Sequence, residues 1–315
     1  MDIAIREILW SPASRSISED AFGFRLTRSG FHLWVVDGAT SLAEEPARYR
    51  PDMTDPAWFA RRLSAGIAGS VLHAPLSPAR LAEVLRGIEA DYMARCRGRV
   101  AEQDYPLAAL TYLHFRPHQA GFCLSRIDHA DCFAEITSAR RPARHRPGFA
   151  MPAVAPYRPL DLSGARGEAM RARRLAQIRD CASTAVTIHP RSTGTGTTAR
   201  QILRGPARFI AGSDGMERYA AAYGLGSMAD ISALAAEGRV LEALVRLRAW
   251  ERANSAHQRE VKTADDVLLV SGEIGSRAGS GLAALRRVER PGVTLWTSPP
   301  GGVSLRLGQG LHIGP

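Results

Sequence analysis

FHLWVVDGAT, residues 31–40, is the stretch that decides the fold, because a run rich in aromatic and branched apolar residues leads without a break into Asp37-Gly38. Residues of this kind favour a β-strand. The Asp-Gly dipeptide is typical of a tight turn at a strand end. An Asp held there, beside a Gly that lets the backbone turn closely, is well placed to bind a cation. We therefore predict a strand over residues 31–36 that brings the Asp37 carboxylate to a site at its end.

Three other acidic clusters occupy loops or strand ends: Glu19-Asp20, Asp214-Gly215 and Asp265-Asp266. The apolar run at 207–212 leads into the second cluster through a serine, and the third opens directly onto the apolar run at 267–270. Carboxylates gathered at strand ends make a hard-cation site, because oxygen ligands suit Mg²⁺ or Mn²⁺ far better than Zn²⁺. Two such ions can activate a water for in-line attack on a phosphate. The clusters together predict a site for two or more Mn²⁺ or Mg²⁺ ions.

The order and spacing of these clusters resemble the metal-dependent protein phosphatase 2C family, from about Arg15 to about Val270. In that family an Arg stands four residues before an acidic pair, one strand ends in Asp-Gly, a later strand ends in Ser-Asp-Gly, and an Asp-Asp or Asp-Asn pair precedes a last apolar strand. This chain carries the four motifs in that order: RSISED at 15–20, VVDG at 35–38, SDG at 213–215 and DDVL at 265–268. Asp-Gly alone is common in turns, so the resemblance rests on the four motifs together.

The resemblance implies a role for each matched residue. Asp37 would bridge two metal ions, and the other acidic side chains would complete the shell, partly through waters. The candidate metal ligands are Glu19, Asp20, Asp37, Gly38 through its backbone carbonyl, Asp214, Asp265 and Asp266. The register of the last motif is ambiguous by one residue, and we favour Asp265 over Asp266. Arg15 joins Asp37 as a candidate catalytic residue, because a guanidinium matches two phosphate oxygens at once.

Each of these residues also has an ordinary interpretation. An Asp after a strand is often only a turn residue, an acidic pair in a loop is most often solvated, and Arg15 could be a surface residue in a chain so rich in arginine. Several acidic clusters favour a metal site, because carboxylates brought together repel unless a cation holds them. The segment TGTGTT at 193–198 lacks the Gly-Lys-Ser/Thr of a phosphate-binding loop, and we interpret it as a flexible turn.

Three departures from the family pattern bear on activity. Ala39 stands where many eukaryotic members carry a His thought to act as general acid, so the leaving-group proton has to come from water or another group. Ala130-Asp131-Cys132 replaces the family's central Gly-Asp-Ser, which leaves Asp131 a weak ligand candidate. The usual Gly-Thr-Thr is missing, and LAALT at 107–111 looks like its counterpart. These departures keep open a catalytically weak pseudophosphatase that acts as a binding module.

The composition is that of a globular protein with a basic surface. The chain has 315 residues, 45% of them hydrophobic, which allows one large domain or two small ones. The formal net charge of +10 comes almost wholly from arginine, since Lys262 is the only lysine. This skew indicates genomic base composition first, so we predict no specific nucleic-acid partner. A basic surface still favours acidic or phosphorylated partners.

Cysteine usage and hydropathy favour a cytoplasmic protein. The cysteines are scattered, without a CxxC pair, at Cys96, Cys123, Cys132 and Cys181. The amino terminus, MDIAIREILW, lacks a basic leader followed by a long apolar stretch, and no apolar run reaches 18 residues. We therefore expect neither export nor a membrane span.

Strand and helix patterns alternate in groups along the chain. Predicted strands cover residues 3–10, 22–36, 107–115, 120–128, 131–138, 207–212 and 267–270. Predicted helices cover residues 56–72, 78–96, 167–182, 228–236 and 239–255. Helices followed by consecutive strands imply a sheet with helices on its outer face. The resemblance implies the full architecture, an α+β fold built as a four-layer αββα sandwich of two antiparallel sheets flanked by helices.

We predict one catalytic domain over residues 1–275 and a Gly- and Pro-rich C-terminal extension over residues 276–315. Within the domain, residues 139–182 form a predicted basic insertion, in which an Arg- and Pro-rich exposed loop precedes a basic helix. This insertion is where a groove open to a protein loop would differ from a lid closed over a metabolite.

These features predict a metal-dependent phosphate monoester hydrolase of bacterial type, acting on phosphoserine or phosphothreonine in proteins. A phosphoprotein substrate and a partner kinase are the expected partners. One alternative keeps the chemistry but takes a small phosphorylated metabolite or nucleotide, since function resides in the walls of the site rather than in the fold. The other alternative is the pseudophosphatase.

Overall fold

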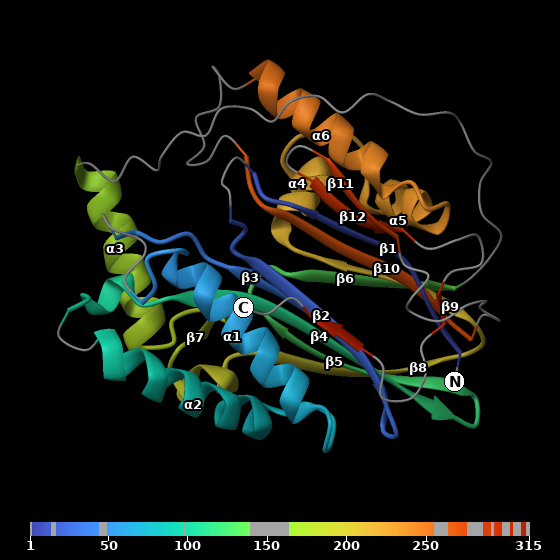
Figure 1. Cartoon of the computed structure of the whole chain (residues 1–315), viewed down its shortest axis with the longest axis horizontal. Helices are drawn as coiled ribbons and strands as arrows, with labels where there is room; N and C mark the ends of the chain where they lie inside the picture. The colour runs from blue at the N-terminus through green and yellow to red at the C-terminus, as the bar shows by residue number, and fades with distance from the viewer. Residues whose placement is uncertain are drawn as a thin grey trace.

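The computed structural model describes residues 2–13, 17–43, 49–96, 99–138, 164–254, 264–275, 286–290, 293–297, 303–304 and 310–312. These residues form two β-sheets packed face to face, with helices against both outer faces (Figure 1). The predicted α+β fold and its four-layer αββα order are thereby confirmed.

The first sheet has seven strands in the described part of the chain. In order they are β11 (Arg286–Arg290), β12 (Val293–Thr297), β1 (Ile3–Ser11), β10 (Val267–Ile274), β9 (Ala207–Gly212) and β6 (Phe133–Ser138), with β13 (Val303–Ser304) also paired to β1. All of these pairs are antiparallel. Every residue of the central strand β10 is buried, because both faces of the sheet are covered.

The second sheet also has seven described strands. In order they are β14 (Gly310–His312), β2 (Asp20–Thr27), β3 (Gly30–Gly38), β4 (Leu107–His118), β5 (Gly121–His129) and β8 (Thr197–Leu203), with β7 (Val186–Thr187) also paired to β4. These pairs are antiparallel too. Phe31 of β3 and Phe209 of β9 meet between the sheets with ring centroids 5.7 Å apart, so the core between the two sheets is continuous.

Helices form the two outer layers. Against the second sheet lie α1 (Asp55–Ser70) and α2 (Pro78–Cys96), and against the first lie α4 (Asp214–Ala221), α5 (Met228–Ala236) and α6 (Val240–Asn254). The start of α1 is fixed by Thr54, whose side chain accepts a hydrogen bond from the Ala57 amide, and by Pro56 in the first turn. One further helix, α3 (Gly164–Arg179), packs at one end of the sandwich beside a short 3₁₀ turn at Glu102–Asp104.

Residues 22–36, predicted as one strand, form a hairpin instead. β2 ends at Thr27 and β3 begins at Gly30, whose φ is +138°. A Cβ at this position would lie 2.2 Å from the carbonyl oxygen of Phe115, so only glycine fits. The prediction missed this turn because only two residues, Arg28 and Ser29, separate the two apolar strands.

The prediction of a flexible turn over residues 193–198 was wrong in part, because Thr197 and Thr198 begin β8. Six of the seven residues of this edge strand are exposed. An exposed strand has no apolar alternation, so its pattern does not distinguish it from a turn.

Described strands beyond residue 275 belong to both sheets. β12 pairs with β1, and β14 pairs with β2. The predicted boundary at residue 275 stays a prediction, but these strands are integral to the sandwich rather than appended to it. Residues 139–163 of the predicted insertion lie outside the described residues, and the rest of it contributes α3. No helix of the described chain is long and apolar enough to cross a membrane.

Candidate metal centre

The β2–β3 hairpin brings the first two acidic clusters together. Asp20 and Asp37 are direct cross-strand partners, so their side chains leave the same face of the sheet. The Gly38 amide donates to the Glu19 carbonyl oxygen at 3.1 Å. A Cβ on Gly38 would lie 2.7 Å from that oxygen and 2.8 Å from the carbonyl oxygen of Pro56. Glycine at 38 is therefore required for this close approach of three backbone segments.

The first sheet brings its acidic residues to the same place. Gly212, the last residue of β9, pairs with Leu269 near the start of β10. Residues that follow β9 therefore lie beside residues that precede β10, at the same end of the two strands. Ser213 links this end of the first sheet to the second sheet, since its hydroxyl donates to Asp20 Oδ2 at 2.9 Å and accepts from the Leu268 amide at 3.0 Å. This role of Ser213 was not predicted, although the residue belongs to the Ser-Asp-Gly motif.

Asp20 is buried among like charges. Burial raises the pKa of the Asp20 carboxyl well above its usual range, and the carboxylates of Asp266, Asp265 and Asp214 raise it further against the Ser213 hydrogen bond. Asp20 Oδ1 is buried and has no hydrogen-bond partner among the described residues. A buried acceptor without a partner is costly, so this oxygen marks a place where a cation or a proton would stabilise the fold.

Cys132, just before β6, lies close to the same cluster of aspartates. Its buried thiol lies just before β6, and its pKa is raised by burial first and then by Asp37, Asp20 and two other aspartates. The thiol therefore stays protonated beside the cluster. Its neighbour Ala130 has φ +56°, a left-handed conformation that suits the glycine found there in the family pattern.

The structure separates the two aspartates of the last motif. Asp266 is 8% exposed, and its oxygens accept the backbone amides of Ala13 at 2.8 Å and Glu19 at 2.7 Å. Asp265 instead lines a cleft, and Arg218 Nη2 lies 3.8 Å from its Oδ2. This placement is the one expected if Asp265 is the ligand and Asp266 fixes the loop, and both roles stay predictions.

The Glu19 side chain also forms hydrogen bonds with two neighbouring segments of the chain. It is 3% exposed, and its carboxylate accepts hydrogen bonds from the hydroxyls of Thr54 at 2.8 Å and Thr40 at 3.2 Å. Thr54 caps α1, so Glu19 ties the helix start to the strand ends. A direct metal role for Glu19 would have to coexist with these two bonds.

A cleft of about 320 Å³ lies over the strand ends. Its carboxylates are Asp37, Asp131, Asp214 and Asp265. Glu19, Asp20, Gly38 and Asp266 are buried beside these residues, whereas Arg15 lies outside the described residues. Carboxylates that are far apart in the sequence thus meet at one cleft.

Arginines of α3 line the same cleft. Arg173 is exposed, while burial lowers the pKa of Arg174 to about 10 despite the nearby Glu19 and Asp104 carboxylates. Arg174 Nη2 donates to the Thr40 carbonyl oxygen at 3.3 Å. The sequence showed α3 to be basic on one side, but nothing in it showed that this side faces the acidic clusters. The cleft can therefore place an anion between arginines and carboxylates.

The donor chemistry fits hard divalent cations. The acidic side chains that line the cleft are aspartates, whose oxygens are the ligands that Mg²⁺ and Mn²⁺ prefer, and the Asp20 oxygen without a hydrogen-bond partner is buried beside them. In the described part of the chain, no three His, Cys, Asp or Glu side chains are arranged so as to hold one ion together. The site thus offers the ligand types for Mg²⁺ or Mn²⁺, gathered at one cleft but without a closed coordination shell.

Comparison with solved structures shows similarity to serine/threonine phosphatases. The Mycobacterium tuberculosis phosphatase PstP/Ppp is 15% identical, with 87% of this chain and 99% of that chain covered and a TM-score of 0.47. The photosystem II phosphatase PBCP is 15% identical, with 86% and 98% covered and a TM-score of 0.48. The PstP catalytic domain, solved with two manganese ions, is 14% identical, with 86% and 98% covered and a TM-score of 0.43.

No family model matches the chain, and no curated protein matches it. At these identities and TM-scores the solved structures carry no argument about activity. The αββα assignment rests instead on the strand pairing and on the hydrophobic cores that lie between the two sheets and beneath the two helical layers in the described residues.

Proposed function

We propose that this protein is a metal-dependent phosphate monoester hydrolase that removes phosphate from phosphoserine or phosphothreonine in proteins. One observation carries the proposal: carboxylates from both sheets converge on a single cleft that arginines of α3 also line. Carboxylates favour cations and arginines favour phosphate. A cleft with both is suited to a phosphate ester held beside divalent metal ions.

The carboxylates divide by placement into two groups. Asp37, Asp214 and Asp265 face the cleft and would hold the metal ions, with Asp20 supplying its free Oδ1 from behind. Glu19 and Asp266 would act through the hydrogen bonds that fix the loops around them. When bound, the cations supply Lewis-acid activation of water and neutralise charge on the phosphoryl group.

The arginines would hold the substrate. Arg174 is partly buried, and its remaining N–H groups can bind phosphate oxygens more strongly than in water, because the local dielectric constant is lower. Arg15 is proposed to share this role. With Ala39 in place of a general acid, the leaving-group proton has to come from water or another group.

The experiment is a manganese-dependent assay on an aryl phosphate beside a panel of phosphopeptides, with Asp37→Asn and Asp214→Asn as test variants. Both variants should stay folded, lose turnover and bind Mn²⁺ at least tenfold more weakly, which is about 1.4 kcal/mol. The control is Glu83→Gln, which removes a charge from a side chain 65% exposed on α2. Wild-type-like turnover in either test variant would refute the metal assignment.

The same panel tests the substrate class. Turnover of aryl phosphate and small phosphorylated metabolites without turnover of phosphopeptides would favour the metabolite alternative. Binding of phosphopeptides without turnover at any Mn²⁺ concentration would favour the pseudophosphatase, for which the departures at Ala39 and Ala130-Asp131-Cys132 are the specific observation.

A further inference from the structure

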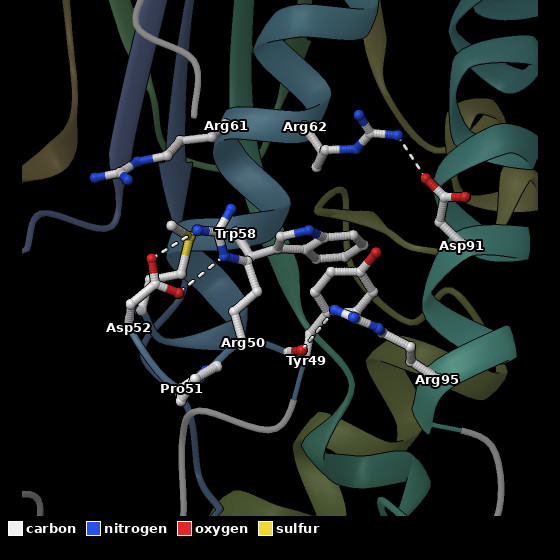
Figure 2. Close-up of a pocket in the computed structure, with 10 residues that line it drawn as sticks. Tyr49, Arg50, Pro51, Asp52, Trp58, Arg61, Arg62, Asp91 and Arg95 are labelled. Atoms are coloured by element: carbon white, nitrogen blue, oxygen red, sulfur yellow. Dashed lines mark hydrogen bonds and ion pairs between the residues drawn. The ribbon is translucent and has the colours of Figure 1, made fainter.

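A second cavity in the described structure shares no lining residue with the carboxylate cleft and lies between the loop that precedes α1 and the two helices of that layer. Its volume is about 570 Å³. Figure 2 shows the side chains that line it: Tyr49, Arg50, Pro51 and Asp52 from the loop, Trp58, Arg61 and Arg62 from α1, and Asp91 and Arg95 from α2. Four arginines face two aspartates, so the lining carries an excess of positive charge.

Three of the four arginines already have partners. Arg50 binds Asp52 through two hydrogen bonds of 2.8 and 2.7 Å, and Arg62 binds Asp91 at 2.5 Å. Arg95 donates to the Tyr49 carbonyl oxygen at 3.2 Å, with its guanidinium 4.9 Å from the centroid of the Tyr49 ring. These contacts use both carboxylates of the cavity, and Figure 2 shows the two ion pairs on either side of Trp58.

Arg61 is left over. Its Nε is buried and has no hydrogen-bond partner among the described residues. Burial lowers the pKa of Arg61 and the neighbouring Arg50 lowers it further, whereas the Asp52 carboxylate, already paired with Arg50, raises it only in part. A guanidinium held partly buried beside another one is costly unless an anion compensates it. Arg61 is therefore a donor without an acceptor on the wall of a cavity of small-ligand size.

The wall around Arg61 is held in place by packing. The rings of Tyr49 and Trp58 stack with centroids 4.0 Å apart, and Asp55 accepts both the Tyr49 amide at 2.8 Å and the Tyr92 hydroxyl at 2.7 Å. The Tyr49 ring is already packed against Trp58 and the Arg95 guanidinium. A ligand therefore gains chiefly from charge-assisted hydrogen bonds rather than from aromatic stacking.

We propose that this cavity is a second anion site, which binds a small phosphate-bearing molecule through Arg61 with help from Arg50. The volume lies within the range of small-molecule pockets. Arg50 keeps unused N–H groups after pairing with Asp52, because a guanidinium has five donors. The site is separate from the proposed metal centre, and neither proposal depends on the other.

The test is calorimetric titration of the full-length protein with inorganic phosphate, in EDTA and without added divalent cations. We expect a Kd of about 1 mM or tighter for the wild type and at least tenfold weaker binding in Arg61→Gln. The matched control is Arg86→Gln, because Arg86 is 62% exposed on α2 outside the cavity. Adenosine monophosphate in place of phosphate decides the source: much tighter binding favours a nucleotide, and equal binding favours free phosphate.

Hydrogen exchange on the wild-type protein localises the site whether or not Arg61→Gln folds well. Phosphate should slow exchange of amides at residues 49–53, which form the loop wall of the cavity. The proposal is overturned if phosphate leaves these amides unchanged, or if Arg61→Gln binds phosphate as the wild type does.

Discussion

Replacing Arg248 with methionine should destabilise the protein through a buried ion pair behind the metal centre. Arg248 and Glu251 of α6 are both fully buried. Arg248 Nη1 donates to Glu251 Oε2 at 2.7 Å, and Nη2 donates to the Asp265 carbonyl oxygen at 2.7 Å. The pair therefore joins the outer helical layer to the backbone of a proposed metal ligand.

The expected cost follows from what Arg248→Met leaves behind. Removing one partner of a buried ion pair costs about 3–5 kcal/mol, because the other charge stays buried. Burial already raises the pKa of Glu251, and Arg248 is the largest opposing influence. Without Arg248 the carboxyl can take up a proton, which limits the cost to the lower end, about 3 kcal/mol. Arg248→Met with Glu251→Leu should recover most of that loss.

Urea denaturation at pH 7 measures both variants, with the free energy of unfolding taken from the midpoint and slope. The single variant should unfold at a markedly lower urea concentration, and the double variant near the wild type. Mn²⁺ binding should be weaker than wild type in both, because both lose the bond to the Asp265 carbonyl. A loss below about 1 kcal/mol in Arg248→Met, or a double variant no more stable than the single one, would refute the reasoning.

Four further substitutions give distinct outcomes. Glu7 is 2% exposed, and burial raises its pKa to about 7 against a Val240 amide hydrogen bond; the unfolded chain releases this proton near pH 4.5. Stability from Glu7 is thus complete below pH 4.5 and lost as pH rises through 7, by up to about 3 kcal/mol relative to Glu7→Gln in denaturation at several pH values. Ala130→Gly should raise the free energy of unfolding by about 0.5–1 kcal/mol, because φ is +56° there; a lower melting temperature would contradict this. Asp265→Asn should weaken Mn²⁺ binding with little loss of stability, whereas Asp266→Asn should lose about 1–3 kcal/mol by breaking a hydrogen bond to a backbone amide; the reverse pattern would exchange the two roles.

The layers of the fold could be predicted because each strand and helix is specified locally. The run at 31–36 is apolar enough to be buried on both faces, and the Thr54–Pro56 cap marks the start of α1. Elements whose stability comes from neighbours were missed. β8 is an exposed edge strand that depends on β5, and the β2–β3 turn depends on a glycine that fits against Phe115.

The types of ligand at the site could be predicted from the sequence, but the role of each carboxylate could not. Sequence places Asp265 and Asp266 side by side, and both could bind a cation. Only the fold shows that the Ala13 and Glu19 amides, some 250 positions away, occupy the Asp266 oxygens. The same holds for Arg174, which looks like one more solvated arginine until α3 packs beside the cleft. Contacts between distant segments carry this information, and local patterns cannot, because the periodicity of a strand or helix specifies which face is buried and not which partner covers it.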